Sequence, residues 1–151
     1  MNRSADLDAF RAASRKYSDT SILMHEAISR KAGLSGTDHK YLGLLMAHGP
    51  MTAGELSHRT GLTGGAVTGL IDRLEKKKLA KREFDKDDRR KVFIVANEAN
   101  ALKLLTPLFK DLQQKTTKLL GSYSDTELEI IKNYMSAATQ VMNEVLEKLK
   151  K

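Results

Sequence analysis

Two short helices joined by a glycine-containing turn are predicted between residues 52 and 76. Thr52 is followed three residues later by Glu55, a spacing at which each side chain can satisfy a free backbone amide of the other at a helix start. Gly61 ends this helix, because glycine readily leaves the helical conformation. A second helix starts at Thr63. Two short helices connected in this way are typical of a helix-turn-helix unit.

The second helix combines an apolar face with a face that is rich in glycine. Its apolar residues recur at helical spacing and must pack on something; they are Val67, Leu70, Ile71 and Leu74. Glycine inside a helix costs roughly 0.5 to 1 kcal/mol of stability relative to alanine. This cost is offset where the missing side chain lets the backbone closely approach another surface. We predict that this face enters the major groove of DNA through Thr63, Gly64, Gly65, Thr68 and Gly69. The alternative is an irregular helix start that packs against a neighbouring segment.

A charged hairpin is predicted directly after these helices. Two extended runs, residues 79–84 and 92–96, flank the charged loop DKDDRRK. A helix-turn-helix followed by a hairpin is the winged-helix arrangement. The tip carries Arg89 and Arg90, and arginine is favoured where the minor groove is narrow and its negative potential is strongest. Ordinary solvated surface charge is the alternative interpretation of these arginines.

Positive charge is concentrated in the same region. The chain of 151 residues has a formal net charge of +7, and its length suits one domain with a substantial core. Residues 72–91 hold ten Lys or Arg against six Asp or Glu, a net charge of +4, which indicates a polyanionic partner. Non-specific attraction to DNA phosphates is expected from Lys76, Lys81, Arg82, Lys86 and Lys91.

A resemblance to a known family lies in residues 54–95, GELSHRTGLTGGAVTGLIDRLEKKKLAKREFDKDDRRKVFIV. The helix GAVT-x-LIDRLE and the DRR tip followed by a strand resemble the DNA-binding core of the MarR family of bacterial transcriptional regulators. The resemblance implies that Arg73 lies near the operator backbone, the alternative being an ion pair within the helix or exposure to solvent. It also implies that Asp88 braces Arg90 through a bidentate pair.

Long helices are predicted on both sides of the winged region. In the last helix apolar residues alternate by three and four without a break, as in helices that pack side by side. This stripe either folds onto its own chain or meets a partner. A two-fold dimer would place two recognition helices one DNA turn apart, so we predict a homodimer that binds a palindromic double-stranded operator. The expected dimer contacts are Leu7, Phe10, Leu128, Ile131, Met135, Met142, Val145 and Leu149.

The predicted fold is mainly α-helical with a small β-wing. Residues 37–97 form the winged helix-turn-helix domain, and residues 1–36 and 98–151 form a helical dimerisation module from both chain ends. Met51 is expected to add a short edge strand to the wing sheet. Pro107 falls inside the helix that follows the wing, where it removes one backbone hydrogen bond.

The family resemblance further implies that a small, often aromatic or phenolic, effector relieves DNA binding. Such a compound would enter a cleft between the dimerisation helices and the winged domain. Residues that could line this cleft are Arg15, His25, His39 and Tyr41. A single His or Tyr beside an apolar face is more often part of an ordinary packed interface, and that alternative stays open.

Other sites and functions are disfavoured by the residues present. The chain has no cysteine, hence no disulfide, no thiolate metal site and no Cys redox switch. Ser29 occupies the second His position of the zinc motif H-E-x-x-H, and the glycines near residue 64 lack the order of a phosphate-binding loop. We therefore expect no metal, no cofactor and no enzymatic activity. No apolar run approaches the roughly 18 residues of a membrane span, so we expect a cytoplasmic protein.

The sequence thus predicts a sequence-specific DNA-binding transcriptional regulator, a homodimeric repressor released by a small-molecule effector. An effector-independent winged-helix protein with an architectural role on DNA is the alternative. A helical adaptor whose basic wing no longer touches DNA is a third option.

Overall fold

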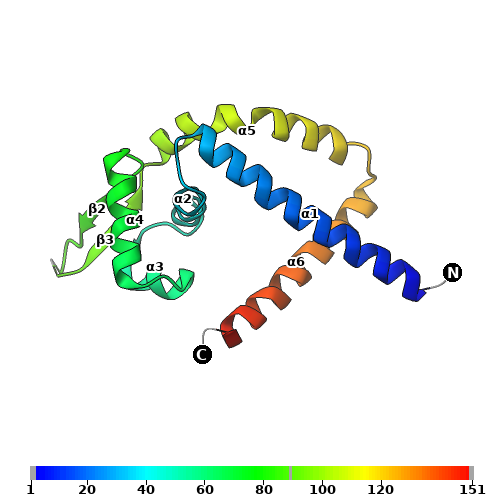
Figure 1. Ribbon diagram of the computed structural model, residues 1–151, viewed down its shortest axis with the longest axis horizontal. Helices are drawn as coiled ribbons and strands as arrows, with labels where there is room; N and C mark the ends of the chain where they lie inside the picture. The colour runs from blue at the N-terminus through cyan, green and yellow to red at the C-terminus, as the bar shows by residue number, and fades with distance from the viewer. Residues whose placement is uncertain (1–2, 89, 150–151) are drawn as a thin grey trace. The chain divides into compact units, whose positions relative to one another are not determined.

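Figure 1 shows the computed structural model, which describes residues 3–88 and 90–149. In this part of the chain, six helices and a three-stranded antiparallel sheet follow one another. Their order is α1 (Arg3–Lys31), α2 (Gly36–His48), β1 (Met51–Thr52), α3 (Ala53–Thr60), α4 (Gly64–Lys76), β2 (Ala80–Phe84), β3 (Val92–Ala96), α5 (Glu98–Leu120) and α6 (Asp125–Leu149). The predicted fold class, mainly helical with a small wing, is confirmed.

The chain forms two compact units, Met1–Leu108 and Phe109–Lys151. The first unit contains α1 to α4, the sheet and the beginning of α5, and the second contains the rest of α5 and α6. Pro107 lies inside α5 beside the boundary between the units. This division follows contacts within one chain, so the functional division into a winged domain and a dimerisation module stays a prediction.

The core of the first unit is centred on α4. The apolar stripe predicted for this helix is buried, with 0 to 2% of each residue exposed: Val67, Leu70, Ile71 and Leu74. Side chains from α2, α3 and β3 complete the core around the stripe, chiefly Leu42, Leu45, Leu56 and Ile94. Burial of one face of α4 leaves its opposite face at the surface.

The helix-turn-helix is fixed by caps at both helix starts. The Thr52 amide donates to Glu55 Oε2 at 2.7 Å, and the Glu55 amide donates to Thr52 Oγ1 at 3.2 Å. These bonds from the Thr52 backbone and side chain hold the pKa of Glu55 below its ordinary value. Gly61 ends α3 with a left-handed φ of 72°, and Thr63 caps α4 by accepting a bond from the Ala66 amide. The capping box and the glycine stop were both predicted from the sequence.

The wing sheet has β3 as its central strand, between β1 and β2. Met51 pairs with Ile94, so it supplies the expected edge strand. On the other side of β3, β2 pairs from Ala80 opposite Ala96 to Phe84 opposite Val92. The tip of the wing therefore projects beyond Phe84, away from the core.

The apolar stripe of α6 is exposed within the second unit. None of the described residues of α6 is buried. Met142 is 64% exposed and Leu149 is 78% exposed. The helix therefore gains little from burial within the second unit.

Candidate nucleic-acid interface

The glycines of α4 lie on its outward face. Gly64 and Gly65 are exposed, and a Cβ atom added at either position would meet no heavy atom within 4 Å. A Cβ atom at Gly69 would lie 3.3 Å from Nη1 of Arg73. Packing within the chain therefore does not require glycine at residues 64 and 65. A close approach by something outside the chain would require it.

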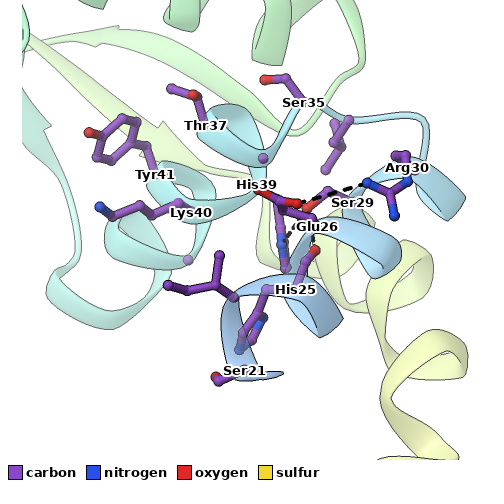
Figure 2. Close-up of a pocket in the computed structure, with 14 residues that line it drawn as sticks. Ser21, His25, Glu26, Ser29, Arg30, Ser35, Thr37, His39, Lys40 and Tyr41 are labelled. Carbon is purple, nitrogen blue, oxygen red and sulfur yellow. Dashed lines mark hydrogen bonds and ion pairs between the residues drawn. The ribbon is translucent and has the colours of Figure 1, made fainter. Parts of the chain in front are cut away.

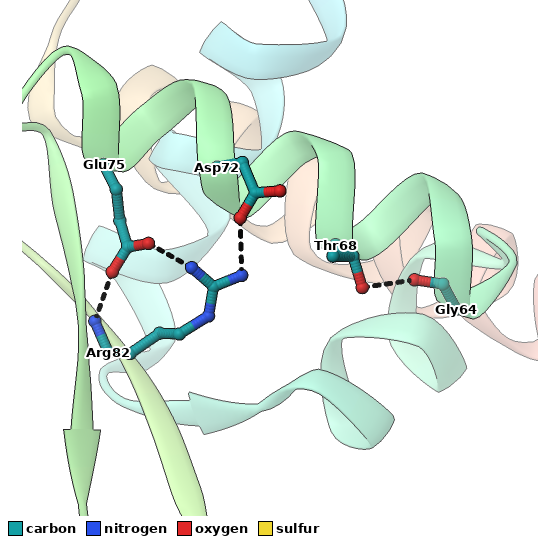
Figure 3. A network of polar contacts seen from close by, with 5 residues as sticks. All are labelled: Gly64, Thr68, Asp72, Glu75 and Arg82. Atoms are coloured by element: carbon teal, nitrogen blue, oxygen red, sulfur yellow. Dashed lines mark hydrogen bonds and ion pairs between the residues drawn. The ribbon is translucent and has the colours of Figure 1, made fainter.

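The two threonines of this face are exposed but already engaged within the helix. Thr63 Oγ1 accepts a hydrogen bond from the Ala66 amide at 3.3 Å, and Thr68 Oγ1 donates to the Gly64 carbonyl at 3.0 Å (Figure 3). A hydroxyl group has one donor and two acceptor positions. Thr63 can therefore still donate to a phosphate, and Thr68 can still accept from a base or a water molecule.

Arg73 connects α4 to the first turn of α2. Its Nε donates to Asp38 Oδ1 and Oδ2 at 3.1 and 3.0 Å, and its Nη2 donates to Oδ1 at 2.7 Å. The Asp38 carboxylate is almost completely buried, whereas about half of the Arg73 side chain is exposed. The hydrogen bond to Asp38 raises the pKa of Arg73. Neither sequence interpretation of Arg73 included this partner, which lies 35 residues away in the chain.

At the wing tip, Asp88 holds the guanidinium of Arg90. Arg90 Nε donates to Asp88 Oδ1 at 3.1 Å, and Nη2 donates to Oδ2 at 3.4 Å. The Arg90 side chain is nevertheless 92% exposed. The pair implied by the family resemblance is present, and it presents an oriented cation to the surroundings. Arg89, the other predicted tip residue, lies outside the described residues.

Backbone hydrogen bonds to Asp85 shape the loop behind this cation. Asp85 Oδ1 accepts from the amides of Asp88 and Asp87 at 2.9 and 2.8 Å, and these bonds hold the pKa of Asp85 below its ordinary value. The Asp85 amide donates to the Lys91 carbonyl at 2.9 Å, which closes the loop at its base. The side chains of Lys86 and Lys91 in this loop are exposed, as is that of Lys76 at the end of α4.

Arg82 of β2 is held by two carboxylates of α4. Its Nη2 donates to Asp72 Oδ1 at 2.7 Å, its Nη1 pairs with Glu75 Oε2, and its amide donates to Glu75 Oε1 at 2.8 Å (Figure 3). These bonds raise the pKa of Arg82, with the Asp72 hydrogen bond as the largest cause. Sequence reasoning placed Arg82 among the phosphate-attracting cations, whereas the structure gives it two carboxylate partners on α4.

A groove of about 1040 Å³ lies between α1 and α2 (Figure 2). Three of the four residues predicted for an effector cleft line it: His25, His39 and Tyr41. Arg15 is not brought together with them and borders a separate surface groove with other residues of α1. The reason is distance along the helix, since ten residues of α-helix span about 15 Å.

Ser29 also lines this groove and was not predicted as a lining residue. Its Oγ donates to the His25 carbonyl at 2.6 Å and lies 2.9 Å from Nδ1 of His39. Because the hydroxyl has one proton and donates it to His25, the contact with His39 requires Nδ1 of His39 to be the donor. Burial lowers the pKa of His39 below its ordinary value of 6.5, and the nearby His25 acts in the same direction.

The described residues show neither a membrane span nor a metal site. No helix among them has both the length and the apolar character needed to cross a bilayer. Within residues 3–88 and 90–149, no group of three or more His, Asp or Glu side chains is placed to hold a metal ion.

Known proteins share both the sequence and the fold. The sequence model of the MarR family matches residues 32–91. The Bacillus subtilis (strain 168) protein named "Uncharacterized HTH-type transcriptional regulator YcgE" is 43% identical over 136 residues, covering 90% of this chain and 88% of that protein. A MarR family protein from Bacillus stearothermophilus has a TM-score of 0.73 at 21% identity, with 95% of this chain and 99% of that chain covered. The chain therefore belongs to the MarR family of transcriptional regulators.

Proposed function

We propose that this regulator is a sequence-specific, homodimeric repressor that binds a palindromic operator and is released by a small-molecule effector. The observation that carries DNA binding is the open, glycine-lined face of α4. Among residues 3–88 and 90–149, no heavy atom lies within 4 Å of a Cβ atom added at Gly64 or Gly65, so none of these residues requires glycine there. The exposed Arg90, held by Asp88, supplies the matching minor-groove contact from the wing.

Dimerisation is supported by apolar surface at both chain ends. On α1, Leu7 and Phe10 are each about half exposed, and α6 buries none of its described residues. The proposed contacts on α6 are Leu128, Ile131, Met135, Met142, Val145 and Leu149. A second copy of the chain would cover this surface and supply a second recognition helix for the other half-site.

Effector release is supported by the groove between α1 and α2. It combines apolar wall with hydrogen-bonding groups from His25, His39 and Tyr41, a mixture that suits a small aromatic or phenolic compound. His39 belongs to the same helical turn as Asp38, which binds Arg73 of α4. A compound that displaced this turn would therefore act on the recognition helix.

The first test is selection of bound duplexes from a random pool with the full-length protein. We expect a palindromic consensus whose half-sites lie about 34 to 36 Å apart. Failure to enrich any sequence above the starting pool would reject sequence-specific binding. Enrichment of a single, non-repeated site would reject the symmetric dimer.

The second test is a thermal-shift screen of small aromatic acids and phenols, followed by operator binding with each stabilising compound. Linkage requires that a releasing effector binds the free protein more tightly than the operator complex. Stabilising compounds that leave operator affinity unchanged, or a screen with no stabilising compound, would favour the effector-independent architectural binder.

A further inference from the structure

One arginine fastens the wing to the recognition helix. Arg82 lies on β2 opposite Ile94 of β3, and its guanidinium reaches across to Asp72 and Glu75 of α4. These two acidic residues are three positions apart in the helix and so share one face. The amide of Arg82 also donates to Glu75, so both the strand backbone and the side chain are attached (Figure 3).

We propose that Arg82 is a positioning residue, which holds the wing at a fixed angle to α4 so that both engage adjacent grooves of one duplex. The inference rests on the proposed function, and it names a residue that determines the specificity of DNA binding. Arg82 lies near the base of the wing, whereas Arg90 lies in the tip beyond Phe84. A small rotation about the base is therefore amplified at the tip.

The surroundings of Arg82 disfavour the simpler role of a phosphate contact. Its side chain is 34% exposed, compared with 61% for the neighbouring Lys81 and 92% for Arg90. One guanidinium against two carboxylates gives the cluster a net charge of −1, which repels phosphate. A cluster with a net negative charge weakens non-specific attraction to DNA. Its contribution to operator binding must therefore come from the position in which it holds the wing.

The chemistry of the side chain explains why arginine suits this position. A guanidinium is planar and presents several donors in a fixed fork, so it can bind two carboxylates at once. A lysine at this position would keep the charge but, as a compact point charge, could not hold both partners in one geometry. Substitution by lysine therefore separates the effect of charge from the effect of position.

The experiment compares operator binding with binding to a scrambled duplex of the same length. The variants are Arg82→Lys and the double variant Asp72→Asn with Glu75→Gln. Lys81→Gln is the control for the exchange measurement below, because Lys81 is adjacent on β2 and pairs along its own strand, with Glu83 at 2.5 Å. Since Lys81 is itself an expected phosphate contact, its DNA affinity is not used as a baseline. Circular dichroism and thermal unfolding establish that each variant is folded.

If Arg82 is a positioning residue, the double variant should change the affinities for the two duplexes in opposite directions. Removing two negative charges near the DNA should strengthen binding to the scrambled duplex, because repulsion of phosphates is reduced. On the positioning role, operator affinity falls by roughly tenfold in the same variant, the loss typical of a broken charged hydrogen-bond network. A rise in affinity for both duplexes would overturn the inference.

Arg82→Lys supplies the second readout. For a positioning role, operator affinity falls by roughly tenfold although the positive charge is kept, while the affinity for the scrambled duplex stays near that of the parent. Unchanged operator affinity would overturn the inference.

A third readout uses the free protein. Hydrogen–deuterium exchange over residues 80–96 should be faster in Arg82→Lys than in the parent or in Lys81→Gln, and equal exchange in all three would overturn the inference. If the parent itself selects no DNA sequence, the proposed function fails and the specificity role falls with it. If the parent selects an operator and the variants bind it equally well, this inference alone fails.

Discussion

Gly65 is a residue at which stability and DNA binding are expected to oppose each other. It is the second residue of α4 with open space beside it, so Gly65→Ala should raise the free energy of unfolding, by less than the roughly 0.5 to 1 kcal/mol expected at a mid-helix position. The added methyl group should lower operator affinity, because it keeps the backbone away from the major groove. Urea unfolding and fluorescence anisotropy with the operator measure the two effects.

Gly43 provides the matched control for this substitution. It is also a helical, exposed glycine with no heavy atom within 4 Å of an added Cβ, but it lies on α2. Gly43→Ala should stabilise the protein at least as much, because Gly43 lies in the middle of its helix, and should leave operator affinity unchanged. Equal operator binding by Gly65→Ala and the parent would show that this face of α4 does not approach DNA closely.

Arg90 is expected to supply operator affinity from the wing. Arg90→Ala should weaken operator binding several-fold or more at matched salt, because it removes a cation that Asp88 has already oriented. Asp88→Asn should cause a smaller loss, since Arg90 keeps its charge but regains rotamer freedom. Titrations of both variants against the selected operator check this order. The reverse order would contradict the bracing role of Asp88.

His39 should make stability depend on pH. Its pKa in the folded protein is lowered, so between that pKa and 6.5 the unfolded chain binds more protons than the folded one. The stabilising effect of neutral His39 is therefore present above pH 6.5 and is lost as the pH falls through the lowered pKa. Urea midpoints measured from pH 5 to 8 should fall toward acid in the parent and fall less in His39→Gln. Identical pH profiles would refute this assignment.

At the scale of single elements, α6 is expected to act through its uncovered apolar stripe. Met142→Glu should convert the proposed dimer into monomers, because burial at the contact would then remove a charge from water. Ser136→Glu is the control, since residue 136 lies off the stripe and one turn after Lys132, where a carboxylate is favourable. Sedimentation velocity distinguishes the two species. A dimer that persists in Met142→Glu would place the contact elsewhere.

The positions of the elements were largely predictable because local chemistry sets them. Thr52 and Glu55 mark the start of α3 by reciprocal bonds within four residues, and Gly61 marks its end by a conformation that glycine adopts easily. The wing strands were predicted to within a residue, because the charged loop DKDDRRK separates two short extended runs.

The side-chain network between elements was not predictable from sequence spacing. Asp38 meets Arg73 and Asp72 meets Arg82 only after α2, α4 and β2 have packed together. Charge alone assigned Arg82 to DNA phosphates, and only the folded arrangement shows its two carboxylate partners. For Arg15 the prediction had the correct helix but overlooked its length, so this residue borders a different groove from His25.

At the scale of the whole molecule, α4 is attached on two sides within the first unit. Arg73 links it to Asp38 of α2, where the groove between α1 and α2 begins, and Arg82 links the wing to it. On the proposed function, effector binding in the groove and the orientation of the wing both affect DNA binding through α4. The residues that would read DNA and those that would sense an effector are therefore joined by charged pairs as well as by the apolar core.

The exposed apolar stripe of α6 has a consequence for a regulator that is present in few copies per cell. If only paired chains occupy both half-sites, diluting the protein reduces the paired fraction as well as the total. Occupancy of the promoter would then fall more steeply than abundance, and a cell that inherits few copies would lose control of the gene abruptly rather than in proportion.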